Sequence, residues 1–313
     1  MSDGSGSVLH EAAMAPVPGS STGQNARPEV AARLLGEALR QARKERNLAL
    51  RDVAPVIRGS VSKLSRLERG ESPPKDRDVR DLVAHYRLAG DRVHEIEALL
   101  QQAKDNAWWQ QYSDVTPNWL KRLIGLEDGA TRIYCYENHV VPGLLQTTEY
   151  TRALVTNGLP GAGAEEVERR VRLRLERQRI IRSPQRPDII AMLDEGILLR
   201  PVGGPAVMSR QLDHLIQLSD QGRINIRVVP FDRSASAAPS YPITHLTFGD
   251  GGPSELVYVE LIDSAMYLSR PAEIEQYRLV LLNLAKASAR RKDSRAMLEQ
   301  ARDRYAAHAE ESL

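Results

Sequence analysis

Three short segments with helical periodicity, separated by breaks, most constrain how this 313-residue chain can fold. The first is 31–46 (AARLLGEALRQARKER), in which Leu and Ala recur along one side of a helix. The second, 50–57 (LRDVAPVI), is much shorter. The third, 61–69, follows Ser60, a residue type that caps helix N-termini, and precedes Gly70, a residue type that ends helices. This spacing predicts two short helices joined by a tight turn and packed against a longer first helix.

The third segment has an apolar face and a polar face. On a helical wheel Leu64 and Leu67 point inward, toward the other two helices. The outer face carries hydroxyl and guanidinium groups. Arginine pairs bidentately with a guanine edge and serine bonds to several bases, so this face is suited to contacts with DNA. The outer side chains are Ser62, Arg66 and Arg69, with Ser65 at the flank.

Positive charge is concentrated around the same segments. Between Leu39 and Arg69 the chain has nine lysines and arginines but only three acidic residues, although its overall net charge is only +2. A local cationic stretch in a near-neutral chain is typical of a surface that contacts nucleic-acid phosphates. A solvated helix face has the same charge pattern, so the prediction depends on the charge and the helix spacing together.

The segment QARKERNLALRDVAPVIRGSVSKLSRLERGESPP resembles the lambda-repressor/Cro-like helix-turn-helix, also called the XRE family, over about residues 33–87. Its most specific part is SKLSRLERG, which is similar to the end of the family's recognition helix. The resemblance implies binding to double-stranded DNA through base contacts, phosphate contacts and an ion pair that braces the recognition helix. These roles fall on Val61, Ser62, Ser65 and Arg66 for bases, Lys63 and Arg69 for phosphates, and Arg43 with Glu68 for the structural ion pair.

The chain departs from that family at the start of the second helix. Ala49 and Leu50 stand where the family often has Thr and Gln, so we expect Arg51 to supply the phosphate contact made there. The free backbone N–H groups that follow Ser60 offer a further phosphate site at a helix N-terminus. Pro55 is also unusual inside a short helix, but proline costs little within the first helical turn.

The predicted fold class is multidomain, with an all-α five-helix helix-turn-helix domain followed by an α+β domain with a mixed sheet. The first residues are rich in Gly, Ser, Ala and Pro and lack periodicity, which predicts disorder. They do not resemble a signal peptide, and no apolar run approaches the roughly 20 residues that span a bilayer. The predicted divisions are a disordered tail at 1–28, the helix-turn-helix domain at 29–105, a linker or hinge at 106–124, and a regulatory and dimerisation domain at 125–309.

Helical and strand-like patterns mix in the second half of the chain without regular alternation, which favours a mixed sheet. The predicted strands are 130–136, 188–193, 223–230, 243–248 and 256–262. The predicted helices are 76–87 and 91–104 in the first domain, and 143–156, 164–182, 206–220, 271–289 and 293–308 in the second.

Five motifs of the second half occur in the order VPGLLQTTEYTRAL, RLERQ, DEGILLRPVGG, VMSRQLDHL and INIRVVPF. Together they resemble, over about residues 125–300, the C-terminal domain of unknown function of actinobacterial antitoxin-like, WhiJ-type regulators. The resemblance implies a regulatory, antitoxin-like or developmental role, often with a small protein partner. Within RLERQ, Arg177 and Gln178 are candidates for a polar network in the core.

The residues indicate no enzyme activity and no cofactor or metal. The only cysteine, Cys135, excludes an intramolecular disulfide and fits a reducing cytoplasm. Cys135 and His139 are four residues apart, but a metal site needs about three or four ligands, so packing is the prediction for Cys135. The adjacent carboxylates Asp194 and Glu195 have no nucleophile or base beside them in any recognisable motif, which favours a turn or an ion pair over catalysis.

Several aromatic residues are candidates for an effector pocket. The alternative is that the tryptophans anchor a core or an interdomain hinge, since aromatic side chains provide much of the area buried in cores and interfaces. An apolar pocket with a few polar groups is the usual form of a small-molecule site. The candidates for such a pocket are Trp108, Trp109, Trp119, Tyr134, Tyr136 and Tyr258.

These observations predict a cytoplasmic, nucleoid-associated transcriptional regulator that binds DNA as a homodimer. Its C-terminal domain is predicted to receive a signal from a small molecule or a small protein. The alternative is an antitoxin-like adaptor whose main role is to bind a small protein partner and which binds DNA for autoregulation. Dimerisation is expected because one helix-turn-helix covers only a few base pairs.

Overall fold

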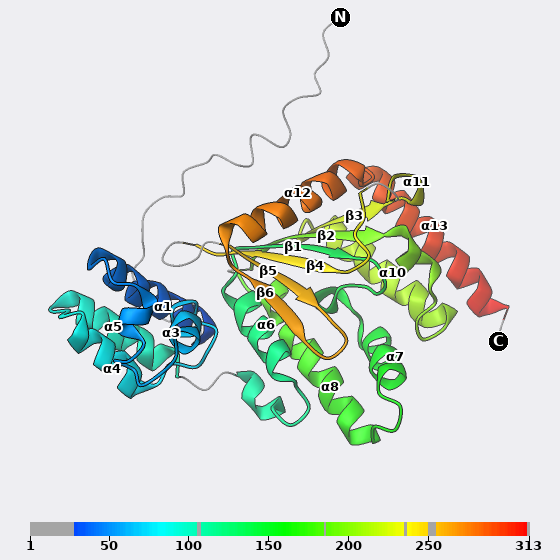
Figure 1. Cartoon of the computed structure of the whole chain (residues 1–313). Coiled ribbons are helices and arrows are strands. Elements are labelled where there is room, and N and C mark those ends of the chain that lie inside the picture. Colours follow the sequence, from blue (N-terminus) through cyan, green and yellow to red (C-terminus); the bar gives the residue numbers. More distant parts are fainter. Residues whose placement is uncertain (1–27, 105–107, 185, 235–236, 250–254, 312–313) are drawn as a thin grey trace, which may run out of the picture.

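The computed structural model describes residues 28–104, 108–184, 186–234, 237–249 and 255–311. These residues form an N-terminal unit of helices and a larger C-terminal unit built on a sheet, lying side by side (Figure 1). The predicted fold class, an all-α domain followed by an α+β domain, is confirmed. The tail predicted at 1–28 lies outside the described residues except for Pro28, which begins the first helix.

The N-terminal unit consists of five helices, as predicted. Their apolar faces meet in one core that includes Leu35, Leu39, Leu64, Leu82 and the fully buried Tyr86. Burying each such leucine contributes roughly 1.5–3 kcal/mol, so this small unit depends on the shared core. The helices are α1 (Pro28–Glu45), α2 (Leu50–Val53), α3 (Val61–Glu68), α4 (Asp76–His85) and α5 (Asp91–Gln102).

Helix α2 is shorter than the predicted 50–57, and Pro55 is the reason. Proline has no N–H group and its ring clashes with the carbonyl one turn earlier, so the helix cannot continue past Val53. The chain turns instead, and the Gly59 N–H donates to the Ala54 carbonyl at 3.1 Å. This turn leads directly into α3.

Helices α1 and α3 approach each other closely at Gly36. A Cβ atom on Gly36 would lie 2.6 Å from the Leu67 carbonyl oxygen and 2.7 Å from that of Glu68, both backbone atoms that cannot move aside. Glycine inside a helix is about 1 kcal/mol less favourable than alanine, so its presence here reflects packing. The end of α3 therefore rests on the backbone of α1.

The segment 106–124, predicted as a linker, contains regular structure. Residues 105–107 lie outside the described residues, but η1 (Trp108–Tyr112) and α6 (Asn118–Gly129) follow. Leu123 and Leu126 of α6 belong to the core beneath the sheet. Residues 118–124 are thus part of the C-terminal unit.

The C-terminal unit is built on one six-stranded sheet with the order β3-β2-β1-β4-β5-β6. β1 pairs with β2 and β2 with β3 in parallel, whereas the remaining pairs are antiparallel, which confirms the predicted mixed sheet. The sixth strand was not predicted, because four residues are too few for a clear alternation. The strands are β1 (Arg132–Glu137), β2 (Asp188–Asp194), β3 (Ile224–Val229), β4 (Ile243–Thr247), β5 (Glu255–Glu260) and β6 (Ala265–Leu268).

Helices cover both faces of the sheet. Helix α12 (Pro271–Ala287) packs on one face (Figure 1). The core under it includes Met192 and Val257. The opposite face carries the larger core, which includes Ile226, Leu246 and Leu212. The helices on that side are α6, α7 (Thr148–Gly158), α8 (Ala164–Arg177), α10 (Pro205–Asp220) and α13 (Arg291–Glu310). The short elements η2 (Gly143–Leu145), α9 (Arg179–Arg182) and η3 (Glu195–Leu199) connect longer ones, and α11 (Phe231–Ser234) contacts α12.

The contact between α1 and α3 gives a stability prediction. Gly36→Val should lower the free energy of unfolding by about 1–3 kcal/mol, because the added atoms meet fixed backbone. Urea unfolding of the full chain, followed by circular dichroism, measures this. Gly158→Ala is the matched control, since a Cβ there meets nothing within 4 Å. A Gly36→Val protein as stable as the wild type would contradict the close packing.

Candidate nucleic-acid interface

Local interactions hold both ends of α3. The Lys63 N–H donates to the Ser60 hydroxyl oxygen at 3.1 Å, so Ser60 is the N-cap. Gly70 has φ +62°, a conformation that favours glycine, and a Cβ there would lie 2.7 Å from the Arg33 Cα atom. Leu64 and Leu67 are buried in the core of the N-terminal unit. The helix therefore begins, ends and faces the core as the sequence predicted.

The outer face of α3 is open to solvent. Val61 is 45% exposed, and Ser62 and Arg66 are exposed beside it. Within the described part of the chain, the Arg66 guanidinium forms no hydrogen bond or ion pair. Its donors are available for a base edge. Ser65 differs, because it is half-buried and its hydroxyl accepts a hydrogen bond from Arg69.

Two of the cations expected to contact phosphate are instead paired with carboxylates of the protein itself. The Lys63 ammonium lies 2.6 Å from an Asp78 carboxylate oxygen and donates to the Ile57 carbonyl at 3.1 Å. The Arg69 guanidinium donates to both carboxylate oxygens of Glu71, at 2.8 and 2.7 Å. These contacts orient the segments that flank α3 and reduce the charge that Lys63 and Arg69 present to DNA.

Arg51 and Ser60 are more accessible. The Arg51 side chain is 85% exposed, and its Nε atom is 3.6 Å from Asp52, its own neighbour in the chain. Ser60 is exposed at the start of α3. Both groups therefore lie where a phosphate can reach them.

The ion pair between Arg43 and Glu68 is present in the structure and is buried. Arg43 Nε and Nη2 donate to the two Glu68 carboxylate oxygens at 2.6 and 2.8 Å, and Nη1 donates to the Leu48 carbonyl at 2.7 Å. Glu68 is only 3% exposed. The hydrogen bond with Glu68 raises the pKa of Arg43 above its usual value. One guanidinium thus joins α1 to α3 and fixes the chain before α2.

The six aromatic residues suggested for an effector pocket do not come together. Trp108 and Trp109 make an edge contact in η1, with ring centroids 5.5 Å apart. Alternation along β1 places Tyr134 and Tyr136 on the face under α12, whereas Tyr258 packs in the core on the opposite face. Trp119 packs at the edge of the same core as Tyr258. The prediction of a single aromatic pocket is therefore wrong, because the alternation of side chains along the strands puts Tyr134 and Tyr136 on one face of the sheet and Tyr258 on the other.

A polar network on the inner side of α8 includes residues of the motifs VPGLLQTTEYTRAL and RLERQ. The Arg177 guanidinium donates to both carboxylate oxygens of Glu127, at 2.5 and 2.6 Å. Gln178 donates to the Gln146 carbonyl at 2.8 Å, and Arg174 donates to the Gln146 side-chain oxygen at 3.1 Å. The prediction that Arg177 and Gln178 form a core network is confirmed.

Sequence reasoning missed Glu127 and Glu137, two buried carboxylates at this network. Burial raises the pKa of Glu137, at the end of β1, to about 8, and the charge of Glu260 adds to the effect. Glu137 and Glu260 end strands that run in the same direction, since each is antiparallel to β4. The only signal in the sequence was a charged residue closing each apolar strand.

The geometry of α1–α5 defines a helix-turn-helix, and comparison with known families agrees. Residues 34–96 match a family described as "Helix-turn-helix domain", which indicates a DNA-binding regulator of the XRE type. Residues 120–300 match a family described as "Domain of unknown function (DUF5753)", and the chain belongs to that family. No curated protein and no solved structure matches the chain. The relationship to WhiJ-type regulators stays a prediction.

Two further observations concern metals and membranes. The described residues contain no group of three or more His, Cys, Asp and Glu side chains able to hold a metal ion. Cys135 is buried, and burial raises the pKa of its thiol. None of the described helices combines the length and the apolar character needed to cross a membrane.

The buried ion pair gives a second stability prediction. Glu68→Gln should lower the free energy of unfolding by about 3–5 kcal/mol, because it leaves the Arg43 charge buried without a carboxylate. Urea unfolding measures the loss. Arg77→Gln is the matched control, since the Arg77–Asp81 pair is exposed and should contribute about 0.5 kcal/mol or less. A cost for Glu68→Gln no larger than for the control would show that the pair does not hold α3.

Proposed function

We propose that this protein is a sequence-specific transcriptional regulator rather than an enzyme, and that α3 is its recognition helix. The observation that carries the proposal is the exposed Arg66 guanidinium, free of partners among the described residues, beside Ser62 and Val61. A bidentate arginine–guanine contact discriminates between bases by about 1–3 kcal/mol. Ser65 contributes less than the other three, because Arg69 occupies its hydroxyl.

Phosphate contacts in this proposal come from Arg51 and from the N-terminus of α3 at Ser60. Lys63 and Arg69 act mainly as positioning residues, since their charged groups are bound to Asp78 and Glu71. Phosphate contacts fix the orientation of a recognition helix, and base contacts determine which sequence it prefers. In this proposal Ser60 orients α3 on the DNA backbone, and Val61, Ser62 and Arg66 determine which sequence it prefers.

A homodimer completes the proposed function, because two copies of α3 are needed to read a two-fold operator of ordinary length. Apolar side chains are exposed on the C-terminal unit at positions suited to protein contact. Leu279 and Leu282, 53% and 42% exposed, lie three residues apart on α12. Monomeric proteins rarely leave contiguous apolar patches uncovered. We place the dimer contact on this unit.

The same exposed side chains favour a second candidate function, an adaptor that binds a small protein partner. Co-purification of the full chain from its native host distinguishes the two. A second copy of the chain as the only stoichiometric component supports the dimeric regulator. A stoichiometric small protein, displaced by charged substitutions at Leu279 and Leu282, supports the adaptor.

The base-reading role of Arg66 has a direct test. An operator is first selected from random-sequence DNA with the wild-type protein. Arg66→Ala should then relax discrimination at one base position by about 1–3 kcal/mol and leave affinity for random DNA nearly unchanged. Arg179→Ala, an exposed arginine on α9, is the matched control. Equal weakening on selected and random DNA would remove Arg66 from base reading.

The phosphate contacts have a separate test. Arg51→Ala should reduce the slope of log affinity against log salt by about 0.9, the value for one lost phosphate contact. Lys63→Ala should leave the slope unchanged, because its ammonium is bound to Asp78. Fluorescence anisotropy with labelled DNA, between about 50 and 200 mM salt, measures both slopes. A reduced slope for Lys63→Ala together with an unchanged slope for Arg51→Ala would assign the phosphate contact to Lys63 instead.

A further inference from the structure

The structure contains a cavity of about 680 Å³ between the N-terminal and C-terminal units. Its volume lies within the roughly 300–1,000 Å³ typical of small-molecule sites. Side chains of α1, of the segment that follows α3, of η1 and of α6 line it. The lining residues include Ala32, Glu71, Pro73, Trp109, Lys121 and Arg122.

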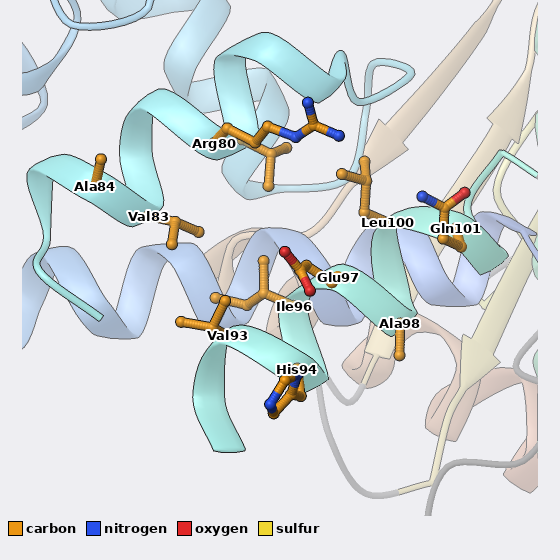
Figure 2. Close-up of a pocket in the computed structure, with 11 residues that line it drawn as sticks. Arg80, Val83, Ala84, Val93, His94, Ile96, Glu97, Ala98, Leu100 and Gln101 are labelled. Atoms are coloured by element: carbon orange, nitrogen blue, oxygen red, sulfur yellow. The ribbon is translucent and has the colours of Figure 1, made fainter. Parts of the chain in front are cut away.

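A second cavity, of about 610 Å³, offers a comparison. It lies between α4 and α5, and Figure 2 shows Val83, Val93 and Ile96 among its lining side chains. All of its lining residues belong to the N-terminal unit. A ligand there would contact one unit only, whereas a ligand in the first cavity contacts both.

The first cavity has an excess of positive charge that the protein does not neutralise. The Arg122 guanidinium lies over the Tyr267 ring, 4.1 Å from its centroid, and forms no hydrogen bond or ion pair with any residue that the structure describes. Among the described residues, Lys121 donates only to neutral acceptors, the Ser113 carbonyl at 3.1 Å and the Asn118 side chain at 3.5 Å. A half-buried cation to which none of the described carboxylates is hydrogen-bonded is a suitable site for an anionic ligand.

The acidic groups in the cavity wall do not offset this charge. Burial lowers the pKa of Arg122, and the nearby charge of Glu71 opposes this only in part; both carboxylate oxygens of Glu71 already accept hydrogen bonds from Arg69. Glu29 is half-buried, and burial raises its pKa to about 7, so much of it is neutral at neutral pH. The remaining cation, Lys104, is paired with Asp76 at 3.1 Å. Arg122 and Lys121 are thus the charges left for a ligand.

The rest of the wall combines apolar side chains, one of them aromatic, with the polar Ser72, Gln110 and Asn118. Trp109 reaches the cavity wall beside Pro73, Pro74 and Ala32, although only 3% of it is exposed. Flat or apolar groups pack well against tryptophan and proline rings. The wall can therefore hold the body of a molecule whose charged group reaches Arg122.

We propose that this cavity binds a small organic anion, in which a carboxylate or phosphate group is attached to an apolar body. Arg122 and Lys121 bind the anionic group, and Trp109 and Pro73 pack against the body. The proposal rests on the signal-receiving role proposed above and gives that role a site. It locates the signal at the junction of the two units rather than within the C-terminal unit alone.

The position of the cavity gives the ligand a route to the recognition helix. Glu71 and Pro73 follow α3 directly, and Gly70 between them and the helix packs against Arg33 of α1. Arg33 in turn lies over the Phe248 ring of the C-terminal unit at 3.7 Å. A ligand that contacts α6 and this segment favours one arrangement of the two units, and its differential affinity shifts the population of the DNA-binding form.

Binding is tested on the full chain with benzoate and phenyl phosphate as probes and with benzamide as the neutral analogue of benzoate. Tryptophan fluorescence and calorimetry should show saturable binding of at least one anion and at least tenfold weaker binding of benzamide. Arg122→Gln should weaken the anion at least tenfold, whereas Arg179→Gln, an exposed arginine on α9, should not. Binding of neither anion, or equal binding of benzoate and benzamide, would overturn the proposal.

Two further variants keep the test independent of folding defects. Ala32→Trp fills the cavity while retaining Arg122, so it should abolish binding without loss of thermal stability. Trp109→Phe should abolish most of the fluorescence change but preserve the calorimetric affinity within about threefold, since phenylalanine retains the apolar contact. Anion binding that survives Ala32→Trp unchanged would place the ligand elsewhere.

The regulatory step is measured with the selected operator. Saturating anion should change operator affinity at least fivefold in the wild type and have no effect in Ala32→Trp. An unchanged affinity, with binding intact, would overturn the regulatory role of the cavity. If the wild type binds no operator at all, the proposed DNA-binding function is contradicted. The calorimetric measurement still shows whether the cavity binds an anion.

Discussion

The buried ion pair between Arg43 and Glu68 is the interaction on which the N-terminal unit depends. A carboxylate that is 3% exposed needs a partner, and Arg43 supplies one with two hydrogen bonds. The remaining donor binds the Leu48 carbonyl, so the same side chain also fixes the entry to α2. Gly36 lets the backbones of α1 and α3 come close enough for this contact. The orientation of α3 follows from these constraints.

Once α3 is fixed, its cations separate into two groups. Lys63 and Arg69 are held by carboxylates that lie outside the helix, Asp78 in α4 and Glu71 beyond Gly70. Arg66 is bound to neither carboxylate and stays free among the described residues. A bound cation contributes to positioning, and a free one can contact a ligand. The recognition face is therefore narrower than the run of positive charge in the sequence suggests.

The C-terminal unit uses paired charges in a comparable way, beneath its sheet. Arg177 and Glu127 join α8 to α6, and Gln178 joins α8 to the segment before α7. Because α6 also packs against α1, through the close approach of Glu29 to Gly125, the network lies one helix away from the N-terminal unit. The cavity at that junction is bounded by α6 on one side and by the segment after α3 on the other.

Features that depend on neighbours in the chain were determined by the sequence alone. The limits of α3 follow from Ser60 and Gly70, its buried face follows from Leu64 and Leu67, and five of the six strands follow from local patterns. Pro55 ends α2 early for an equally local reason, since proline lacks an N–H group and its ring clashes with the carbonyl one turn earlier. Tertiary structure alone decided which cations are free, which aromatic residues meet and that α6 is no linker. Those outcomes depend on residues distant in sequence, and a pattern of types and spacings does not specify which of them come into contact.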